Sequence, residues 1–288
     1  MALRLLVVEG NIRSARDAHA AHYLGKTPAR AYADVLESLA PDAICDICTP
    51  ADEGANLPDS GGLAGYDGVA LTGSGLHIYH GGPEIERQID LARATFASHT
   101  PFFGSCWGLQ VATIASGGAV ARNPAGREAG IARNISPTFA GQAHPLLAGR
   151  PSAFDAPCVH FDNVSTLPPG AIVLAQNAYS PVQAAEIRHD GGLFWGVQYH
   201  PEYALDQLAA IFERGWENLV GAGMAADKAA ALAHAGELRA LHNNSARHDI
   251  AWRLGIQPEI LDPELRLTEL RNWLSLLVRP EKSKRGRA

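Results

Sequence analysis

The chain has no long apolar run, few cysteines and no excess of basic residues. No stretch reaches the ~18 apolar residues that suggest a membrane-spanning helix, and the N-terminus leads directly into a strand pattern rather than a signal peptide. Four cysteines in 288 residues are too few for a disulfide framework. The formal net charge of -6 argues against a nucleic-acid surface. These absences predict a cytoplasmic protein whose partners include neither a membrane nor a nucleic acid.

Motifs for nucleotide and metal binding are also missing. The chain has no P-loop, and the two Ser-Gly-Gly sequences at 60–62 and 116–118 lack the Asp-Ser that an ATP pyrophosphatase requires next. The pairs His19/His22 and His77/His80 have ligand spacing without a supporting carboxylate or cysteine, so we interpret them as surface histidines. The CxxC at 45–48 has no second pair and reads as structural, with redox chemistry or zinc binding as the less favoured alternative. We therefore expect neither a metal nor a cofactor.

What the chain does contain is an alternation of strand and helix patterns in its first 116 residues. With 47% hydrophobic residues, the chain can build one large core. Alternating strands and helices imply a parallel sheet covered by helices, so the predicted class is α/β with a mostly parallel central sheet. Expected strands are 3–8, 44–48, 68–71 and 101–104, and expected helices are 27–39, 84–98 and 108–116.

The pattern changes after residue 119. Short strands, including 171–175, 184–188 and 192–198, should fold back onto the same sheet. Beyond them we expect a helical extension over 206–280 and a disordered basic tail over 281–288, leaving 1–205 as the main domain. The apolar faces of the extension helices should pack into the core, with docking of a partner or a homodimer as the alternative.

The most informative motif is Gly-Ser-Cys-Trp-Gly at 104–108, directly after the apolar run 100–103. A nucleophile between small residues, where a strand turns into a helix, is typical of a nucleophile elbow. The turn strains the backbone, and Gly104 and Gly108 lack the β-carbons that would collide there. Cys106 would then lie at a helix N-terminus, where unpaired amides favour the reactive thiolate.

A second motif, Tyr-His-Pro-Glu at 199–202, supplies a base and a carboxylate. Taken singly, Cys106 could be an inert buried thiol, His200 a core histidine and Glu202 a solvated loop residue. Their joint occurrence favours a Cys-His-Glu catalytic triad, in which Cys106 is the nucleophile, His200 the acid and base, and Glu202 the group that orients His200.

The two motifs together resemble the class I glutamine amidotransferase family, and the resemblance covers about residues 3–205. It implies a flavodoxin-like fold and attack of Cys106 on the side-chain amide of glutamine, giving a γ-glutamyl thioester, glutamate and ammonia. It also places one oxyanion donor on Trp107 and the other on the loop containing Gly73 and Ser74. The chain is similar both to the glutaminase domain of GMP synthetases and to stand-alone members that include γ-glutamyl peptidases.

The chain departs from the commonest family pattern at the oxyanion loop. Gly73-Ser74 replaces Gly-Gly-Pro, and this version resembles the stand-alone members. Gln110 matches a family position that contacts glutamine, but an ordinary polar helix residue is an equal interpretation. The segment 160–164, His-Phe-Asp-Asn-Val, resembles one in GMP synthetases; a structural turn is favoured over a supporting role at the site.

Three functions are consistent with these motifs. The first is a glutamine amidotransferase that hydrolyses glutamine and passes ammonia to a separately encoded synthetase. The second is a γ-glutamyl peptidase or hydrolase that uses the same triad on another γ-glutamyl compound. The third, a non-catalytic scaffold, is disfavoured by the intact triad.

Overall fold

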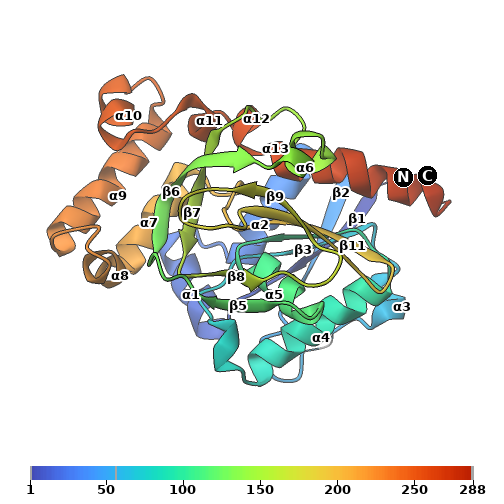
Figure 1. Ribbon diagram of the computed structural model, residues 1–288. Coiled ribbons are helices and arrows are strands. Elements are labelled where there is room, and N and C mark those ends of the chain that lie inside the picture. Colours follow the sequence, from blue (N-terminus) through green and yellow to red (C-terminus); the bar gives the residue numbers. More distant parts are fainter. Residues whose placement is uncertain (1, 56, 287–288) are drawn as a thin grey trace.

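The computed structural model describes residues 2–55 and 57–286 and is built on one central sheet of nine strands (Figure 1). The strand order across the sheet is β2-β1-β3-β4-β11-β10-β9-β6-β7, and β5 and β8 form a separate two-stranded sheet. The strands are β1 (Leu3–Val8), β2 (Ala43–Cys48), β3 (Gly68–Leu71), β4 (Phe102–Ser105), β5 (Ala119–Arg122), β6 (Glu128–Pro137), β7 (Phe154–His160), β8 (Asp162–Thr166), β9 (Ile172–Gln176), β10 (Ala184–His189) and β11 (Gly192–Val197).

The predicted α/β class with a mostly parallel sheet is confirmed. Neighbouring strands β2, β1, β3, β4 and β11 are all parallel, and in the whole sheet only β10 and β6 run against the common direction. The pairs Val8/Leu71, Leu71/Gly104 and Gly104/Gly196 align the carboxyl ends of β1, β3, β4 and β11. Loops that follow these strands therefore meet at one edge of the sheet, where ligands bind in open α/β sheets.

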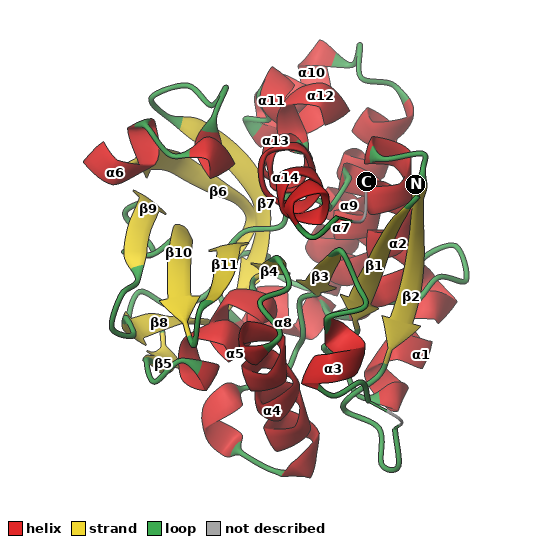
Figure 2. Cartoon of the chain, turned by 90° about the vertical axis from the view of Figure 1, so that its right-hand side faces the viewer, coloured by secondary structure: helices red, strands yellow, loops and turns green. Residues whose placement is uncertain are grey.

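Helices cover both faces of the sheet, as Figure 2 shows from the side. On one face α2 and the C-terminal helices bury one hydrophobic cluster, and on the other α4 and α5 bury a second. The helical elements of the first 150 residues are α1 (Arg13–His22), α2 (Pro28–Leu39), α3 (Ser60–Leu63), η1 (Ile78–His80), α4 (Pro83–Ala97), α5 (Trp107–Ala115), α6 (Phe139–Gln142) and η2 (Pro145–Leu147).

Local sequence explains why some of these helices were predictable and one was missed. Helix α2 begins where expected because Thr27 caps it, accepting a bond from the Arg30 amide, and Pro28 occupies its first turn. Helix α1 was not expected. It begins without a side-chain cap and contains few large apolar residues, so its sequence lacks the usual helix signals.

The extension after residue 204 contains α7 (Leu205–Arg214), α8 (Trp216–Gly221), α9 (Lys228–Asn243), α10 (His248–Leu254), α11 (Pro258–Leu261), α12 (Pro263–Arg266), α13 (Thr268–Asn272), the π-helical η3 (Trp273–Val278) and α14 (Arg279–Lys284). Its first part forms a third hydrophobic cluster, in which α7, α9 and α10 pack together and against residues of β6 and β7. The apolar side chains of α7 are thus covered within the chain.

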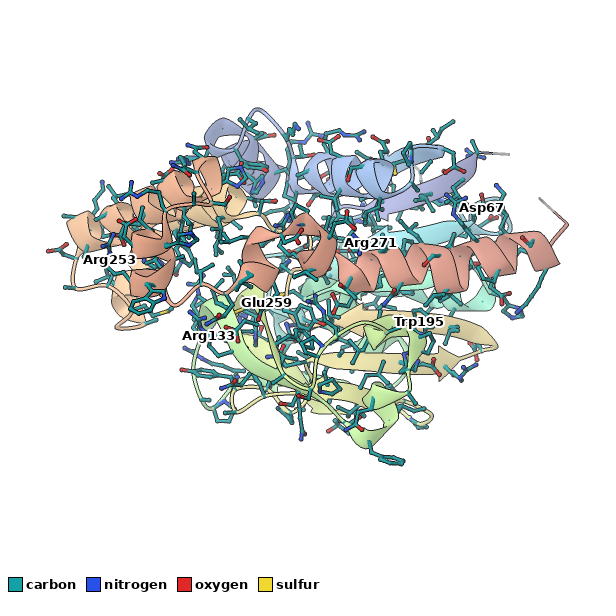
Figure 3. The ribbon with its side chains drawn as sticks, turned by 90° about the horizontal axis from the view of Figure 1, so that it is seen from above. Asp67, Arg133, Trp195, Arg253, Glu259 and Arg271 are labelled. Atoms are coloured by element: carbon teal, nitrogen blue, oxygen red, sulfur yellow. The ribbon has the colours of Figure 1, made fainter. Side chains whose placement is uncertain are left out.

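The last part of the extension is part of the main core. Trp273 is fully buried and packs 5.7 Å from the Phe103 ring, over Gly68, where a β-carbon would lie 2.9 Å from the indole. The expectation of a disordered tail over 281–288 is wrong through residue 286, because α14 reaches Lys284 and the Lys282 ammonium pairs with Asp67 at 3.0 Å. Figure 3 shows this helical segment lying across the sheet, with Asp67 near its end. Residues 287–288 lie outside the described residues.

We predict that Trp273→Ala destabilises the fold by about 3–5 kcal/mol, because it removes a large buried ring from the sheet face. The matched control is Trp252→Ala, since the Trp252 side chain is 91% exposed and its loss should change stability by less than about 0.5 kcal/mol. Urea unfolding of both variants measures the difference. Equal stabilities would mean that the last helices are dispensable for the core.

Within residues 2–55 and 57–286, no helix combines the length and the apolar character needed to cross a bilayer.

Candidate active site

Cys106 lies in the strained turn between β4 and α5. Its backbone φ of 53° is in the left-handed region that L-residues rarely adopt. A β-carbon on Gly104 would lie 2.6 Å from the Gly108 carbonyl carbon, and one on Gly108 would lie 2.6 Å from the Leu71 oxygen. The two glycines therefore let β4, α5 and β3 approach closely, as the elbow motif predicts. The Cys106 amide donates to the Val197 oxygen at 2.7 Å, which ties the turn to β11.

His200 and Glu202 follow β11 and lie beside the elbow. The His200 Nδ1 atom is 2.6 Å from Glu202 Oε1. The other carboxylate oxygen of Glu202 accepts a bond from the Ser105 hydroxyl at 3.0 Å, and that hydroxyl lies 3.1 Å from the Tyr32 hydroxyl. Glu202 is thus fixed from two sides, so it can hold the His200 ring in one orientation.

Several groups determine the charge of His200. Burial lowers the pKa of its imidazole, but the charge of Glu202 and side-chain hydrogen bonds with Cys106 and Glu202 outweigh burial and raise that pKa to about 10. The environment therefore favours the imidazolium beside the sulfur. The Tyr203 ring stacks on His200 with 3.9 Å between ring centroids, and Gly73 lies so close that a β-carbon there would be 2.5 Å from His200 Cε1.

The loop after β3, which contains Gly73 and Ser74, is held by Asn11, which follows β1. The Asn11 side-chain amide donates to the Gly73 oxygen at 3.0 Å, and its oxygen accepts from the Gly75 amide at 3.2 Å. The Thr72 hydroxyl also donates to the Gly73 oxygen, at 3.2 Å. Because the C=O and N–H of a trans peptide point in opposite directions, these bonds direct the Ser74 amide away from Asn11. Trp107 is the first residue of α5, so its amide has no acceptor within the helix.

One cavity of about 370 Å³ joins most of these groups. It brings together the sequence-predicted residues Cys106, His200, Gly73, Ser74 and Gln110, while Glu202 lies behind His200. Additional walls come from α1, from the connection between β7 and β8, and from α7 and α8 of the extension.

Gln110 is buried, and its side-chain NH2 is fully engaged. It donates to the backbone oxygen of Asp162 at 3.1 Å and to Gln198 Oε1 at 3.4 Å. Only the Gln110 side-chain oxygen is therefore free for a ligand, and it can accept but not donate. The segment 160–164 forms the β7–β8 connection and the start of β8, and His160 and Asp162 also line the cavity.

Two of the four histidines expected at the surface, His22 and His80, are exposed, but His19 and His77 are not simple surface residues. His19 is buried at the cavity wall, where burial and the charges of Arg214 and His22 lower its pKa to about 4. His77 does have a carboxylate partner, because its Nδ1 lies 2.6 Å from Asp162 Oδ2. Arg214 near His19 and Asp162 at His77 both come from distant parts of the sequence, so the His-x-x-His spacing does not reveal them. Within the described part of the chain, no group of three or more His, Cys, Asp or Glu side chains could hold a metal ion.

The other three cysteines are poor nucleophiles. Burial raises the pKa of Cys45 and of Cys48 to about 12, and that of Cys158 well above the usual value. All three are free, and Cys45 and Cys48 pack against different hydrophobic clusters. The CxxC spacing therefore does not form a thiol pair.

Sequence reasoning missed several residues around the site. Tyr203 is adjacent to the His-Pro-Glu motif, and an aromatic residue at that position was an available signal. The other residues have no sequence signal that links them to the site, because they come from segments far from both motifs: Asn11, Tyr32 and Arg127. Glu269 of α13 is also informative: it accepts bonds from the Tyr199 hydroxyl at 2.8 Å and from Arg150 at 2.7 Å, so the extension supports the residue before His200.

Several known proteins are similar to this chain over part or most of its length. The sequence model of the family described as glutamine amidotransferase class-I matches residues 47–217. A γ-glutamyl-L-1-hydroxyisopropylamide hydrolase from a Pseudomonas species is 35% identical over 296 residues, which cover 96% of this chain and 94% of that relative. A glutamine-hydrolyzing GMP synthase from Thermomicrobium roseum is 32% identical over 151 residues, covering 52% of this chain but only 26% of the synthase.

Solved structures give the same fold. The crystal structure of a glutamine amidotransferase from Thermotoga maritima superposes with a TM-score of 0.66 at 17% identity, covering 96% of this chain and 99% of that one. The likeness to that solved structure shows the fold, and the match to the family model shows the family. The chain belongs to the glutamine amidotransferase class-I family.

Proposed function

We propose that the chain hydrolyses the γ-amide bond of glutamine or of a substituted γ-glutamyl amide, with Cys106 as nucleophile, His200 as acid and base, and Glu202 as the orienting carboxylate. The observation that supports this best is that Cys106 and His200 line one cavity, and that the Glu202 carboxylate bonds to the His200 imidazole from behind. Family membership and both curated relatives point to the same amide chemistry.

The reaction proceeds in two steps. The Cys106 thiolate attacks the γ-carbonyl carbon, the C–N bond breaks, and His200 gives its proton to the departing amine. A water molecule, deprotonated by the same imidazole, then attacks the thioester, releasing glutamate and restoring the thiol. In both steps the amides of Ser74 and Trp107 stabilise the oxyanion. The side-chain oxygen of Gln110 is left to accept from the substrate α-ammonium group.

A substituted amide is the preferred substrate in this proposal. The relative that matches almost the whole chain, extension included, is named as the hydrolase of a γ-glutamyl amide of a small amino alcohol. The cavity also extends past Cys106 to α1, α7 and α8. A site made for glutamine alone needs room only for ammonia on the leaving side.

Ammonia transfer to a separate synthetase is the second candidate, and the similarity to GMP synthase favours it. Such a partner would control the oxyanion loop by changing its conformation. Here, however, Asn11 and Thr72 already bind the Gly73 oxygen, which supports a loop whose Ser74 amide is positioned to donate without a partner. This argues for an enzyme that works without a partner.

The deciding experiment measures kcat/KM of the purified protein for glutamine and for a series of γ-glutamyl alkylamides. We expect strong turnover without any added protein, with alkylamides preferred over glutamine by at least about 10-fold, which corresponds to about 1.4 kcal/mol or more from extra contacts on the amine side. Weak glutaminase activity that rises on addition of a synthetase would favour the second candidate. No turnover of either substrate class would overturn the proposal.

A further inference from the structure

Arg127 is a partly buried cation in the active-site cavity without an acidic partner. It precedes β6 and lines the same cavity as Cys106 and Gln110. Its Nε and Nη1 atoms are buried and have no hydrogen-bond acceptor among the described residues, and burial lowers the pKa of its guanidinium. Leaving a buried charge unpaired costs free energy, so a protein keeps one where a ligand completes the pair.

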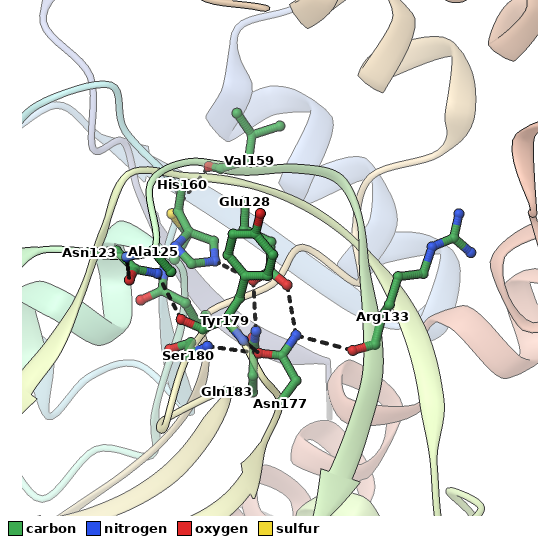
Figure 4. Close-up of polar contacts among 12 residues, drawn as sticks. Asn123, Ala125, Glu128, Arg133, Val159, His160, Asn177, Tyr179, Ser180 and Gln183 are labelled. Atoms are coloured by element: carbon green, nitrogen blue, oxygen red, sulfur yellow. Dashed lines mark hydrogen bonds and ion pairs between the residues drawn. The ribbon is translucent and has the colours of Figure 1, made fainter. Parts of the chain in front are cut away.

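The neighbouring acids are engaged elsewhere. Glu128, the next residue, accepts from His160 at 2.7 Å, Gln183 at 2.8 Å and Asn177 at 2.7 Å, as Figure 4 shows. Asp162 is taken by His77 at 2.6 Å and by the Tyr79 hydroxyl at 3.1 Å. The Phe161 ring lies under the Arg127 guanidinium at 4.4 Å and fixes its plane without neutralising it.

We infer that Arg127 binds the α-carboxylate of the γ-glutamyl group and is the residue that makes the site specific for γ-glutamyl rather than simple amides. The inference rests on the proposed function. A planar guanidinium with unused N–H groups matches a carboxylate, and the free side-chain oxygen of Gln110 in the same cavity matches the α-ammonium group. Arg127 and Gln110 together would bind both charged groups on the substrate α-carbon.

Arg214 is the competing cation, since it also lines the cavity and is in no ion pair within the described residues. It comes from α7, however, and its Nη1 already reaches the Ala15 oxygen at 3.4 Å.

Arg122 offers a matched control, because its guanidinium lies over the same Phe161 ring at 5.9 Å but is exposed and outside this cavity.

The test compares two amides, glutamine and 4-aminobutanamide, which has the same amide and amine but no α-carboxylate. We expect Arg127→Met to lower kcat/KM for glutamine about 10²-fold, mainly through KM, and to leave the already slow turnover of 4-aminobutanamide unchanged. Arg127→Lys should recover part of the loss, and Arg122→Met should behave like the wild type. The thermal midpoint of ligand-free Arg127→Met should equal or exceed that of the wild type, which a merely structural arginine would not allow.

Binding of glutamate, measured by calorimetry and compared with 4-aminobutyrate, separates this inference from the proposed function. If the wild type turns over no amide but binds glutamate through Arg127, the proposed function fails and the carboxylate site stands. Equal losses for both amides in Arg127→Met, unchanged glutamate binding, or a selective loss in Arg214→Met instead would overturn the assignment.

Discussion

Replacing Cys106 with alanine should abolish amide hydrolysis, a loss of at least about 10⁴-fold in kcat. The loss is this large because the thioester cannot form without the sulfur, and no other thiol in the described chain lines the cavity. Release of ammonia or amine at saturating substrate measures it. Cys45→Ala is the control, since that thiol lies on β2 and has its pKa raised to about 12. It should keep full activity.

Chemical labelling tests the same assignment independently. A glutamine-like diazo-ketone should modify Cys106 and spare Cys45, Cys48 and Cys158, because burial raises the pKa of these three thiols and keeps them protonated. Mass spectrometry of the digested protein locates the adduct. Labelling at another cysteine, or turnover that survives in Cys106→Ala, would contradict the assignment of the nucleophile.

Replacing Glu202 with glutamine should lower kcat about 10²- to 10⁴-fold, less than the loss of Cys106. The carboxylate accepts from both His200 and Ser105, and its charge contributes to raising the pKa of His200. An amide of the same shape removes that charge and can present an N–H group to a ring nitrogen that needs an acceptor. Steady-state kinetics and the pH dependence of kcat measure the change.

Glu53→Gln serves as the control for this variant, since Glu53 is an exposed carboxylate away from the cavity. It should show wild-type kinetics. If Glu202→Gln were as active as Glu53→Gln, the orienting role would be refuted. Folding of Glu202→Gln is checked by its thermal transition, so that a loss of kcat is not mistaken for unfolding.

The sheet and the elbow could be predicted because their signals are local. Alternating apolar strands and helices dictate a layered α/β fold, and the close approach of β4, α5 and β3 at the elbow requires glycines at 104 and 108. The helix α1 was not predictable in the same way. Short helices with weak signals are stabilised by what they pack against, and the sequence does not state what that is.

Two residues, His19 and Lys282, have surroundings that the sequence did not predict. His19 reads as a surface histidine, yet the cavity wall formed with α7 buries it. Lys282 reads as part of a solvated basic tail, yet it pairs with Asp67, 215 residues away. In both cases a contact across the fold outweighs the preference of the residue type for solvent.

By itself the sequence determined the α/β class, the nucleophile elbow and the three residues proposed for the triad, because steric limits on a tight turn and the chemistry of acyl transfer allow few residue types there. Only the tertiary structure decided that Asn11 binds the loop containing Gly73 and Ser74, that α14 places Lys282 beside Asp67, and that Arg127 lies in the cavity with no acidic partner among the described residues. These features depend on which distant segments meet. That is settled by packing of the whole chain, since each contact gains its free energy only when the other elements are already in place.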